Sequence, residues 1–340
     1  EAVANIKGRD DILNFFFLEL TLFFILKHVD EKAKKYFVFS VLFFFLSLLC
    51  KEVAVTFLAI IPLTVYFFRD VPLKKIALGF VSFASVLGVY MLIRSSVLET
   101  VTFAEKMKVV NNALAAATTE SDRIATAIFI LGKYILLLFY PHPLSWDYSF
   151  NQIPIAGLTD IKVILTLALF SALGIFAPMN FKRGNVFSYC ILFFFITMSV
   201  VSNIFIMIGA TMGERFLFTP SIAFCIAIPF LLNRFGKNIL LGTITVVLVL
   251  FSLKTFTRNK DWKDNFSLFL SGVEATPNSS RVQSSLGSSY REMGEKETDP
   301  NKRAALFQKA IVYYKKAIEI LHDNTEALYN AGVSYYGMGD

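Results

Sequence analysis

The chain has 340 residues, of which 55% are hydrophobic and 17% charged, against about 25% charged in an ordinary soluble domain. One globular core cannot bury so much apolar surface, so a lipid bilayer has to solvate much of the chain. The net charge of +7 does not indicate nucleic-acid binding, because Lys and Arg lie mostly in short loops between apolar runs, as in membrane topology signals. We therefore expect a bilayer and no nucleic acid among the partners.

Cysteine and histidine give no sign of a metal centre or a disulfide framework. The three cysteines lie in apolar runs, and the three histidines are far apart in sequence. No cofactor is predicted with certainty, and a divalent metal is left open. The chain has no initiator Met and ends within a repeat at Asp340, so we expect a fragment of a longer protein.

Apolar runs follow one another along residues 1–256, which we interpret as the transmembrane part of an all-α fold. Several runs are shorter than the roughly 20 residues of a straight span, which a helix bundle tolerates. The stretch 36–68 is predicted to break at Lys51-Glu52, because a charged pair at mid-bilayer is costly. The runs cover residues 12–29, 36–50, 53–68, 75–94, 123–140, 159–177, 186–207, 216–232 and 238–256.

Loop charges predict the orientation of this multi-pass core. Loops that carry Lys and Arg should face the cytoplasm, which places Lys51-Glu52, Glu214-Arg215 and everything after Phe256 on the opposite side. Between residues 95 and 158 the number of predicted crossings does not fit the sides that the positive loops assign to the two flanking segments. Either 123–140 does not cross, or an amphipathic piece of 97–118 does.

From residue 257 to 340 the sequence turns polar and repeats a pattern typical of TPR helical hairpins. Gly287 and Gly332 lie 45 residues apart, where a TPR has 34. We assign the excess to a longer inter-helix loop around 295–302. The pattern predicts a TPR α-solenoid, a fold that binds peptides or stacks on neighbouring repeats. Its signature positions are Leu286, Gly287, Tyr290, Gly294, Ala310, Tyr314, Ala317, Leu328, Ala331, Gly332 and Tyr335.

Soluble-enzyme motifs are absent from the sequence, so the candidate site residues are charged groups at the outer ends of spans. Arg9 and Asp10 either anchor and cap the helix that follows, or hold a phosphate and a sugar hydroxyl or metal. Lys51 and Glu52 either form a structural ion pair at a helix break or bind a lipid-linked phosphate.

Two further segments carry the same kind of alternative. Glu214 and Arg215 either cap the helix after them, or Arg215 binds a phosphate while Glu214 orients it. Trp146 and Asp147 lie in an aromatic, Pro-rich loop, which is either an interfacial aromatic belt or a contact for a sugar or acceptor.

Taken in order, five motifs followed by repeats resemble the transmembrane-and-TPR O-mannosyltransferases and their bacterial TPR-bearing relatives, in the GT-C glycosyltransferase superfamily. The resemblance implies inverting transfer of a sugar, mannose in eukaryotic members, from a polyprenyl-phosphate donor to a protein hydroxyl outside the cytoplasm. The motifs are EAVANIKGRDDIL, SLLCKEVAVTFLAIIPL, PLSWDYSFNQIP, GERFLFTPSIAF and RNKDWKDNFSLF.

The resemblance also implies roles for residues and partners. The donor cavity would be lined by Lys51, Glu52, Glu214 and Arg215, with Arg9 and Asp10 beside it, and the TPRs would handle the acceptor protein. The family's catalytic acid lies in an outer loop upstream of this sequence, so the sequence should lack its own base. The alternative base is Asp10 or Asp11.

Other classes of function compete with this hypothesis. A non-catalytic membrane scaffold whose TPRs recruit partners is the alternative, while a transporter lacks support because the sequence shows neither internal inverted repeats nor charged residues in mid-span. The residue style suggests a bacterial inner membrane, or the endoplasmic reticulum membrane if the host is eukaryotic. The tail would then be periplasmic or lumenal.

Overall fold

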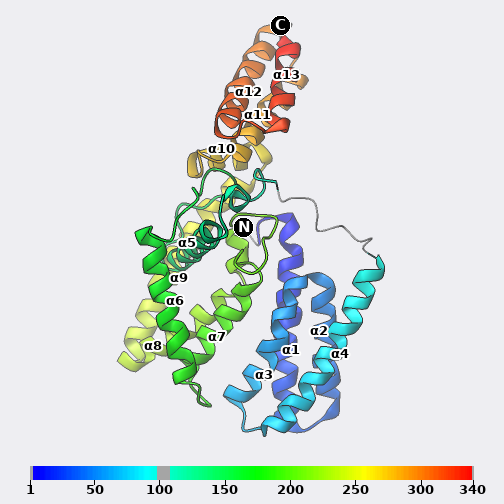
Figure 1. Cartoon of the computed structure of the whole chain (residues 1–340), viewed down its shortest axis with the longest axis vertical. Helices are drawn as coiled ribbons and strands as arrows, with labels where there is room; N and C mark the ends of the chain where they lie inside the picture. The colour runs from blue at the N-terminus through cyan, green and yellow to red at the C-terminus, as the bar shows by residue number, and fades with distance from the viewer. Residues whose placement is uncertain (1–2, 98–107, 339–340) are drawn as a thin grey trace. The chain divides into compact units, whose positions relative to one another are not determined.

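The computed structural model describes residues 3–97 and 108–338. Over these residues the regular structure is helical, without strands (Figure 1), which confirms the all-α prediction. The chain forms two compact units, described separately below. Unit 1 comprises Glu1–Lys106, Leu165–Phe205 and Arg215–Val246, and unit 2 comprises Met107–Ile164, Ile206–Glu214 and Val247–Asp340.

The α-helices occupy most of the predicted apolar runs and the whole of the tail. Short 3-10 helices precede or follow several of them, notably η2 (Glu52–Thr56), η4 (Glu214–Leu217) and η6 (Lys260–Trp262). The α-helices are α1 (Arg9–Glu31), α2 (Lys34–Cys50), α3 (Phe57–Phe68), α4 (Leu73–Val97), α5 (Glu120–Phe139), α6 (Ile161–Met179), α7 (Val186–Ser199), α8 (Ser221–Leu232), α9 (Lys237–Asn259), α10 (Asn265–Ala275), α11 (Ser280–Lys296), α12 (Pro300–Ile320) and α13 (Thr325–Met338).

Four helical segments within the described residues are long and apolar enough to cross a membrane. Their lengths lie between 19 and 26 residues, which matches the roughly 20 residues that a bilayer needs. They mark the chain as a membrane protein. They are Ile6–Glu31, Leu73–Val97, Ile161–Met179 and Lys237–Trp262, and the shorter apolar helices are Glu52–Phe68, Val186–Ser199 and Ser221–Phe235.

Small polar side chains join the helices inside the apolar core of unit 1. Ser40 Oγ on α2 donates to the backbone oxygen of Thr21 on α1 at 2.8 Å. The hydroxyls of Thr64 on α3 and Tyr189 on α7 lie 2.9 Å apart. Each bond pairs polar groups that would otherwise lack a hydrogen-bond partner in an apolar core. Because each bond joins two helices, it fixes their relative register. Buried Leu18, Phe44, Leu48, Phe57, Ile60 and Phe193 pack in this core.

The predicted break at Lys51-Glu52 is confirmed. Helix α2 ends at Cys50, Lys51 is extended (φ −159°, ψ 135°), and η2 begins at Glu52. A charged pair thus stands at a change of helix direction, where the backbone leaves room for both side chains to reach polar partners.

The prediction of one apolar helix over 186–207 is wrong. Helix α7 stops at Ser199, and the residues that follow form turns and bends up to η4. Asn203 is buried and left-handed (φ 59°), a conformation that Asn tolerates better than most residues. Hydropathy records that a segment is apolar, and here a loop that includes the exposed Phe205 and Ile206 gives the same signal as a helix.

Unit 2 begins with a segment of irregular backbone, and hydrogen bonds between side chains and the backbone hold this part of the unit together. Asn112 Nδ2 donates to the backbone oxygen of Ile208 at 2.9 Å, and Tyr134 Oη on α5 accepts from the backbone nitrogen of Gly213 at 3.0 Å. Helix α5 is not among the four spans. Residues 98–107 of the alternative piece, 97–118, lie outside the described residues, so a crossing by this piece stays a prediction.

The tail consists of four consecutive helices, α10 to α13, each of the first three capped by a side chain at its start. Asp264, Ser279 and Asp299 accept hydrogen bonds from backbone nitrogens in the first turns of α10, α11 and α12, as good N-caps do. The preceding helix α9 runs on to Asn259, a little past the predicted start of the tail at 257. The TPR assignment itself stays a prediction that these helices fit.

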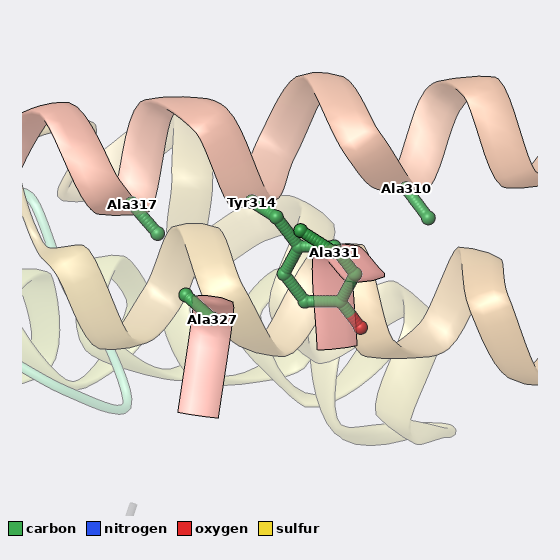
Figure 2. Close-up of a cluster of buried hydrophobic side chains, with 5 residues drawn as sticks. All are labelled: Ala310, Tyr314, Ala317, Ala327 and Ala331. Atoms are coloured by element: carbon green, nitrogen blue, oxygen red, sulfur yellow. The ribbon is translucent and has the colours of Figure 1, made fainter. Parts of the chain in front are cut away.

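Small residues let the tail helices approach closely, as the pattern predicts. Figure 2 shows Tyr314 with the alanines of α12 and α13 that surround it. Tyr314 is fully buried, and its hydroxyl lies 3.0 Å from Ser288 Oγ on α11. A Cβ at Gly287 would lie 2.9 Å from the Tyr314 ring, so α11 and α12 pack this tightly because residue 287 is Gly. The buried cluster is Ala310, Tyr314, Ala317, Ala327 and Ala331.

The longer loop predicted around 295–302 is wrong. Helix α11 ends at Lys296 and α12 begins at Pro300. Asp299 caps α12 and Pro300 occupies its first turn, where Pro is favoured. The extra residues therefore lengthen the two helices instead of the connection, because the polar residues here stand on solvent-facing helix surfaces.

Candidate functional site

The candidate site of unit 1 forms where the start of α1 meets the break after α2. Lys51 Nζ lies 2.6 Å from Asp11 Oδ1 and 3.3 Å from Asp10 Oδ2. The Lys51 side chain is 19% exposed, and those of Asp10 and Asp11 are 40% and 14% exposed. One cation thus holds two adjacent carboxylates at the end of a membrane-spanning helix, and Asp11 is the more deeply placed of the two.

Local sequence explains why the two acids gather there. Asn5 Oδ1 accepts from the backbone nitrogen of Lys7 at 3.0 Å, which starts η1. Asp10 and Asp11 then occupy the first turn of α1, where free backbone N–H groups and the helix dipole favour negative charge. The predicted anchor role and the predicted binding role therefore use the same geometry.

Arg9 and Glu52 flank this ion-paired group rather than joining it. Arg9 is exposed, and its Nε donates to the backbone oxygen of Ile6 at 3.0 Å. Glu52 pairs with Arg94 of α4 at 3.5 Å, and its side chain is 63% exposed. Both side chains are accessible from solvent.

Two buried acceptor atoms at this site make no hydrogen bond within the described structure. They are Asp11 Oδ2 and Asn14 Oδ1, three residues apart and so on one face of α1. Asn14 is 3% exposed. Sequence reasoning missed Asn14, although an amide within an apolar helix, one turn after two acids, is the signal that could have found it. Buried acceptors of this kind suit ligand groups that donate, such as sugar hydroxyls.

In unit 2 the carboxyl of Glu214 is buried among donors. Its Oε1 accepts from the backbone nitrogen of Ser145 at 2.7 Å and from the hydroxyl of Tyr148 at 2.8 Å. Burial raises the pKa of Glu214, while these two hydrogen bonds and the charge of Arg258 act to lower it. The loop of residues 140–148 is thereby fixed to Glu214, the first residue of η4. Sequence reasoning found Glu214 and missed Arg258 as its charged neighbour.

Arg215 follows Glu214 in sequence but belongs to unit 1. Its guanidinium carbon lies 5.3 Å from the centroid of the Phe216 ring, which suits a cation–π contact. The suggestion that Glu214 orients Arg215 stays a prediction.

Asp147 and Trp146 join the aromatic loop to the tail. Asp147 accepts from the backbone nitrogen and hydroxyl of Ser149, both at 2.8 Å, and from Ser279 Oγ at 3.0 Å. Arg281 adds an ion pair at 3.7 Å. With its side chain 12% exposed, Asp147 has little capacity left for a sugar. The ring of Trp146 packs against Phe269 on α10, with centroids 5.1 Å apart.

Among the residues that the structure describes, no three His, Cys, Asp or Glu side chains are grouped so as to hold a metal ion. The acidic site of unit 1 brings together two carboxylates and a lysine, and the ammonium takes the place that a cation would occupy between them.

Together these features define an all-helical membrane protein with polar sites at helix ends and a tail of close-packed helices. Comparison with known proteins names the class more closely. No family model matches the chain, and no solved structure matches it. The chain's curated homologues are the TMTC protein O-mannosyltransferases, which confirms the predicted resemblance to the transmembrane-and-TPR family.

Three of these relatives illustrate the extent of the similarity. Protein O-mannosyl-transferase Tmtc3 of Drosophila melanogaster is 28% identical over 237 residues, and human TMTC3 is 26% identical over 234, each match covering 66% of this chain. Protein O-mannosyl-transferase F38B6.6 of Caenorhabditis elegans is 27% identical over 300 residues, or 84% of this chain. The matched part spans 24% of each Tmtc3 protein and 40% of the nematode one.

Proposed function

We propose that the protein is a membrane glycosyltransferase that moves a sugar from a polyprenyl-phosphate donor to a Ser or Thr hydroxyl of a protein. The observation that carries the proposal is the partly buried acidic site at the start of α1, with Lys51 between Asp10 and Asp11. The O-mannosyltransferase homologues support it, and mannose is the sugar that their names give.

The reaction needs a base and a group that stabilises the leaving phosphate. The acceptor oxygen attacks C1 of the sugar, the bond from C1 to the phosphate oxygen breaks, and polyprenyl phosphate leaves. The hydroxyl proton passes to a carboxylate. Asp10 is the better placed base within this sequence, because it is 40% exposed and 3.3 Å from Lys51, whereas Asp11 is more buried and more tightly paired.

The remaining candidate residues take supporting roles in this proposal. The ammonium of Lys51 has three N–H groups, so it can pair with two carboxylates and still offer one donor to a phosphate oxygen. Asp11 Oδ2 and Asn14 Oδ1 accept hydroxyls of the sugar. Arg9, Glu52 and Arg215 of unit 1 contact the donor, and in unit 2 Glu214 holds the loop with Trp146 and Asp147, which contacts the acceptor.

The proposal includes a multi-pass topology with the reaction on the non-cytoplasmic side. The loop charges support this orientation, and the four apolar helices support several crossings. In this arrangement the tail of α10 to α13 is periplasmic or lumenal and handles the acceptor protein.

The test is a transfer assay on the protein purified with its complete natural chain. Donors are polyprenyl phosphates that carry different sugars, and acceptors are unstructured Ser/Thr-rich peptides, with product detected as a mass increase of one hexose. Transfer that requires the lipid phosphate supports the proposal. Failure of all donors to bind or react would overturn it in favour of a membrane-anchored scaffold.

A further inference from the structure

Unit 2 holds a group of buried hydrogen-bond donors that the roles above do not use. Arg258 stands in the last turn of α9 with its side chain 11% exposed. Its Nη1 is held by Asp261 Oδ2 at 2.7 Å and by Ser271 Oγ at 3.3 Å. Its Nε and Nη2 are shielded from solvent and make no hydrogen bond in the described part of the chain. These two atoms form the edge of a guanidinium that grips an oxyanion with two parallel bonds.

Two indole N–H groups are likewise buried without a hydrogen-bond partner. Trp146 Nε1 and Trp262 Nε1 are buried, and neither meets an acceptor among the described residues. Trp146 and Arg258 contact consecutive residues of α10. A Cβ built on Gly272 would lie 2.6 Å from Trp146 Nε1, and Arg258 reaches the neighbouring Ser271. Trp262 ends η6, four residues after Arg258. These unpaired atoms are all donors, so the chemistry that they lack is an oxygen-rich acceptor.

The place of the cluster in the sequence favours a lipid phosphate over a soluble anion. Arg258 and Trp262 end the segment Lys237–Trp262, which is long and apolar enough to cross a membrane and whose apolar stretch is unburied. The end of a span lies at the level of lipid phosphate groups. Interfacial tryptophans ordinarily turn their N–H toward water or head groups, whereas here both are covered.

One acidic neighbour argues that the guanidinium is not simply a partner of a carboxylate. Glu214 feels the charge of Arg258, yet its Oε1 is taken by Ser145 and Tyr148. Asp261 takes only Nη1. The bidentate edge of Arg258 therefore makes no hydrogen bond within the described residues even with both acids present.

We infer that Arg258, Trp146 and Trp262 form an oxyanion site that binds the phosphate group of a polyprenyl phosphate. The choice of this lipid rests on the proposed function, in which polyprenyl phosphate is both the carrier of the sugar and the product after transfer. Because the donors are covered, binding displaces a covering side chain and changes the surroundings of both indoles.

The chain supplies its own reporter for this site, since Trp146 and Trp262 are its two tryptophans. The protein is held in a maltoside detergent, which carries no phosphate, and tryptophan fluorescence is followed during titration with a short polyprenyl phosphate without sugar. The parallel probes are the same polyprenol without phosphate, and inorganic phosphate. We expect saturable change with the lipid phosphate, no change with polyprenol, and at least tenfold weaker binding of inorganic phosphate.

Variants assign the signal to the guanidinium edge. Arg258→Lys keeps the charge but loses the bidentate edge, and should weaken binding at least about tenfold, which corresponds to 1.4 kcal/mol. Lys260→Gln removes an exposed charge two residues away and should leave binding unchanged. If Arg258→Lys does not fold, Trp262→Phe removes one donor, and Trp146 still reports a several-fold loss.

Equal binding by Arg258→Lys and the unchanged protein would overturn the inference, as would equal signals from polyprenol or inorganic phosphate. The inference and the proposed function fail separately. If polyprenyl phosphate binds but no sugar is transferred, the phosphate site is supported and the proposed transferase activity is rejected. If sugar is transferred but tryptophan fluorescence does not respond to polyprenyl phosphate, the activity is supported and the phosphate site is rejected.

Discussion

The two polar sites of the molecule lack opposite kinds of hydrogen-bond partner. At the acidic site of unit 1, the two buried atoms without a hydrogen-bond partner in the described structure are acceptors, Asp11 Oδ2 and Asn14 Oδ1. In unit 2, the cluster of Arg258, Trp146 and Trp262 leaves only donors unpaired. Since buried polar groups nearly always have hydrogen-bond partners, the unpaired atoms of each site indicate which ligand groups could pair with them. Acceptors suit sugar hydroxyls, and donors suit a phosphate.

The sites also differ in how they are built. The acidic site stands on one helix terminus and one backbone break, and a single lysine holds its two carboxylates. The donor cluster depends on a loop, on the end of α9 and on the close packing of α10. Substitutions in the acidic site should therefore act on chemistry first, and substitutions beside the donor cluster on structure first.

The largest effect is expected from Lys51→Met. It leaves two partly buried carboxylates without their cation and removes a donor from the proposed phosphate contact, so transfer should fall at least about 100-fold. The measurement is kcat/KM for sugar transfer. Lys75→Met, an exposed lysine at the start of α4, is the control and should retain activity. Activity within twofold of the unchanged protein would remove Lys51 from the mechanism.

A crossed pair of substitutions separates the two acids of the site. Asp10→Asn should lower kcat by about 100-fold, as loss of a general base does, while it changes stability by less than about 0.5 kcal/mol because Asp10 is substantially exposed. Asp11→Asn should cost about 1–2 kcal/mol of stability, since the 2.6 Å pair with Lys51 is mostly buried, and lower kcat less.

The two readouts for this pair are the transfer rate and the midpoint of thermal unfolding in detergent. Reversal of the order, with Asp11→Asn the more damaging to kcat, would make Asp11 the base. Equal small effects from both would mean that the base lies elsewhere in the protein.

How much of these sites the sequence could predict depends on the distance over which each contact acts. The break at Lys51 and the acids at the start of α1 follow from local rules about charge and helix ends, and the structure agrees with them. Asn14 was within reach of the same rules. The Glu214–Tyr148 bond joins residues 66 apart, through loops that carry no hydrophobic period, so no local pattern specifies it.

The errors in the predicted fold have a similar origin. Residues 200–213 are as apolar as a span, yet Asn203 is left-handed, Ser202 Oγ accepts from the backbone nitrogen of Ile204, and the backbone forms turns and bends instead of a helix. Conversely, the polar residues between α11 and α12 extend the helices, because a polar residue is tolerated as well on the solvent-facing surface of a helix as in a loop. Hydropathy reports the surroundings of a segment more directly than it reports backbone conformation.

A smaller effect should come from Gly272→Ala beside the donor cluster. The added Cβ would lie 2.6 Å from Trp146 Nε1, so the indole or α10 has to move, at a cost of about 1–3 kcal/mol. In a Trp262→Phe background, the fluorescence of Trp146 measures the displacement directly. Gly332→Ala, whose Cβ would have open space, is the matched control and should be neutral or stabilising by up to about 1 kcal/mol. An unchanged Trp146 spectrum would contradict the packing described here.

The smallest effect is expected from Glu214→Gln, and its sign depends on pH. Burial raises the pKa of Glu214 above its unfolded value, so the folded state binds the proton more tightly than the unfolded state does. Stability from this group is complete below the unfolded pKa, about 4.3, and is lost as pH rises through the folded pKa. Gln keeps an oxygen that can accept from Ser145 and Tyr148 and carries no charge. The two proteins should therefore melt alike in acid, while at neutral pH the variant should be the more stable one, by less than about 1 kcal/mol. Thermal unfolding across this pH range measures the difference, and a variant that instead loses stability as pH rises would mean that Arg258 and the hydrogen bonds outweigh burial at Glu214.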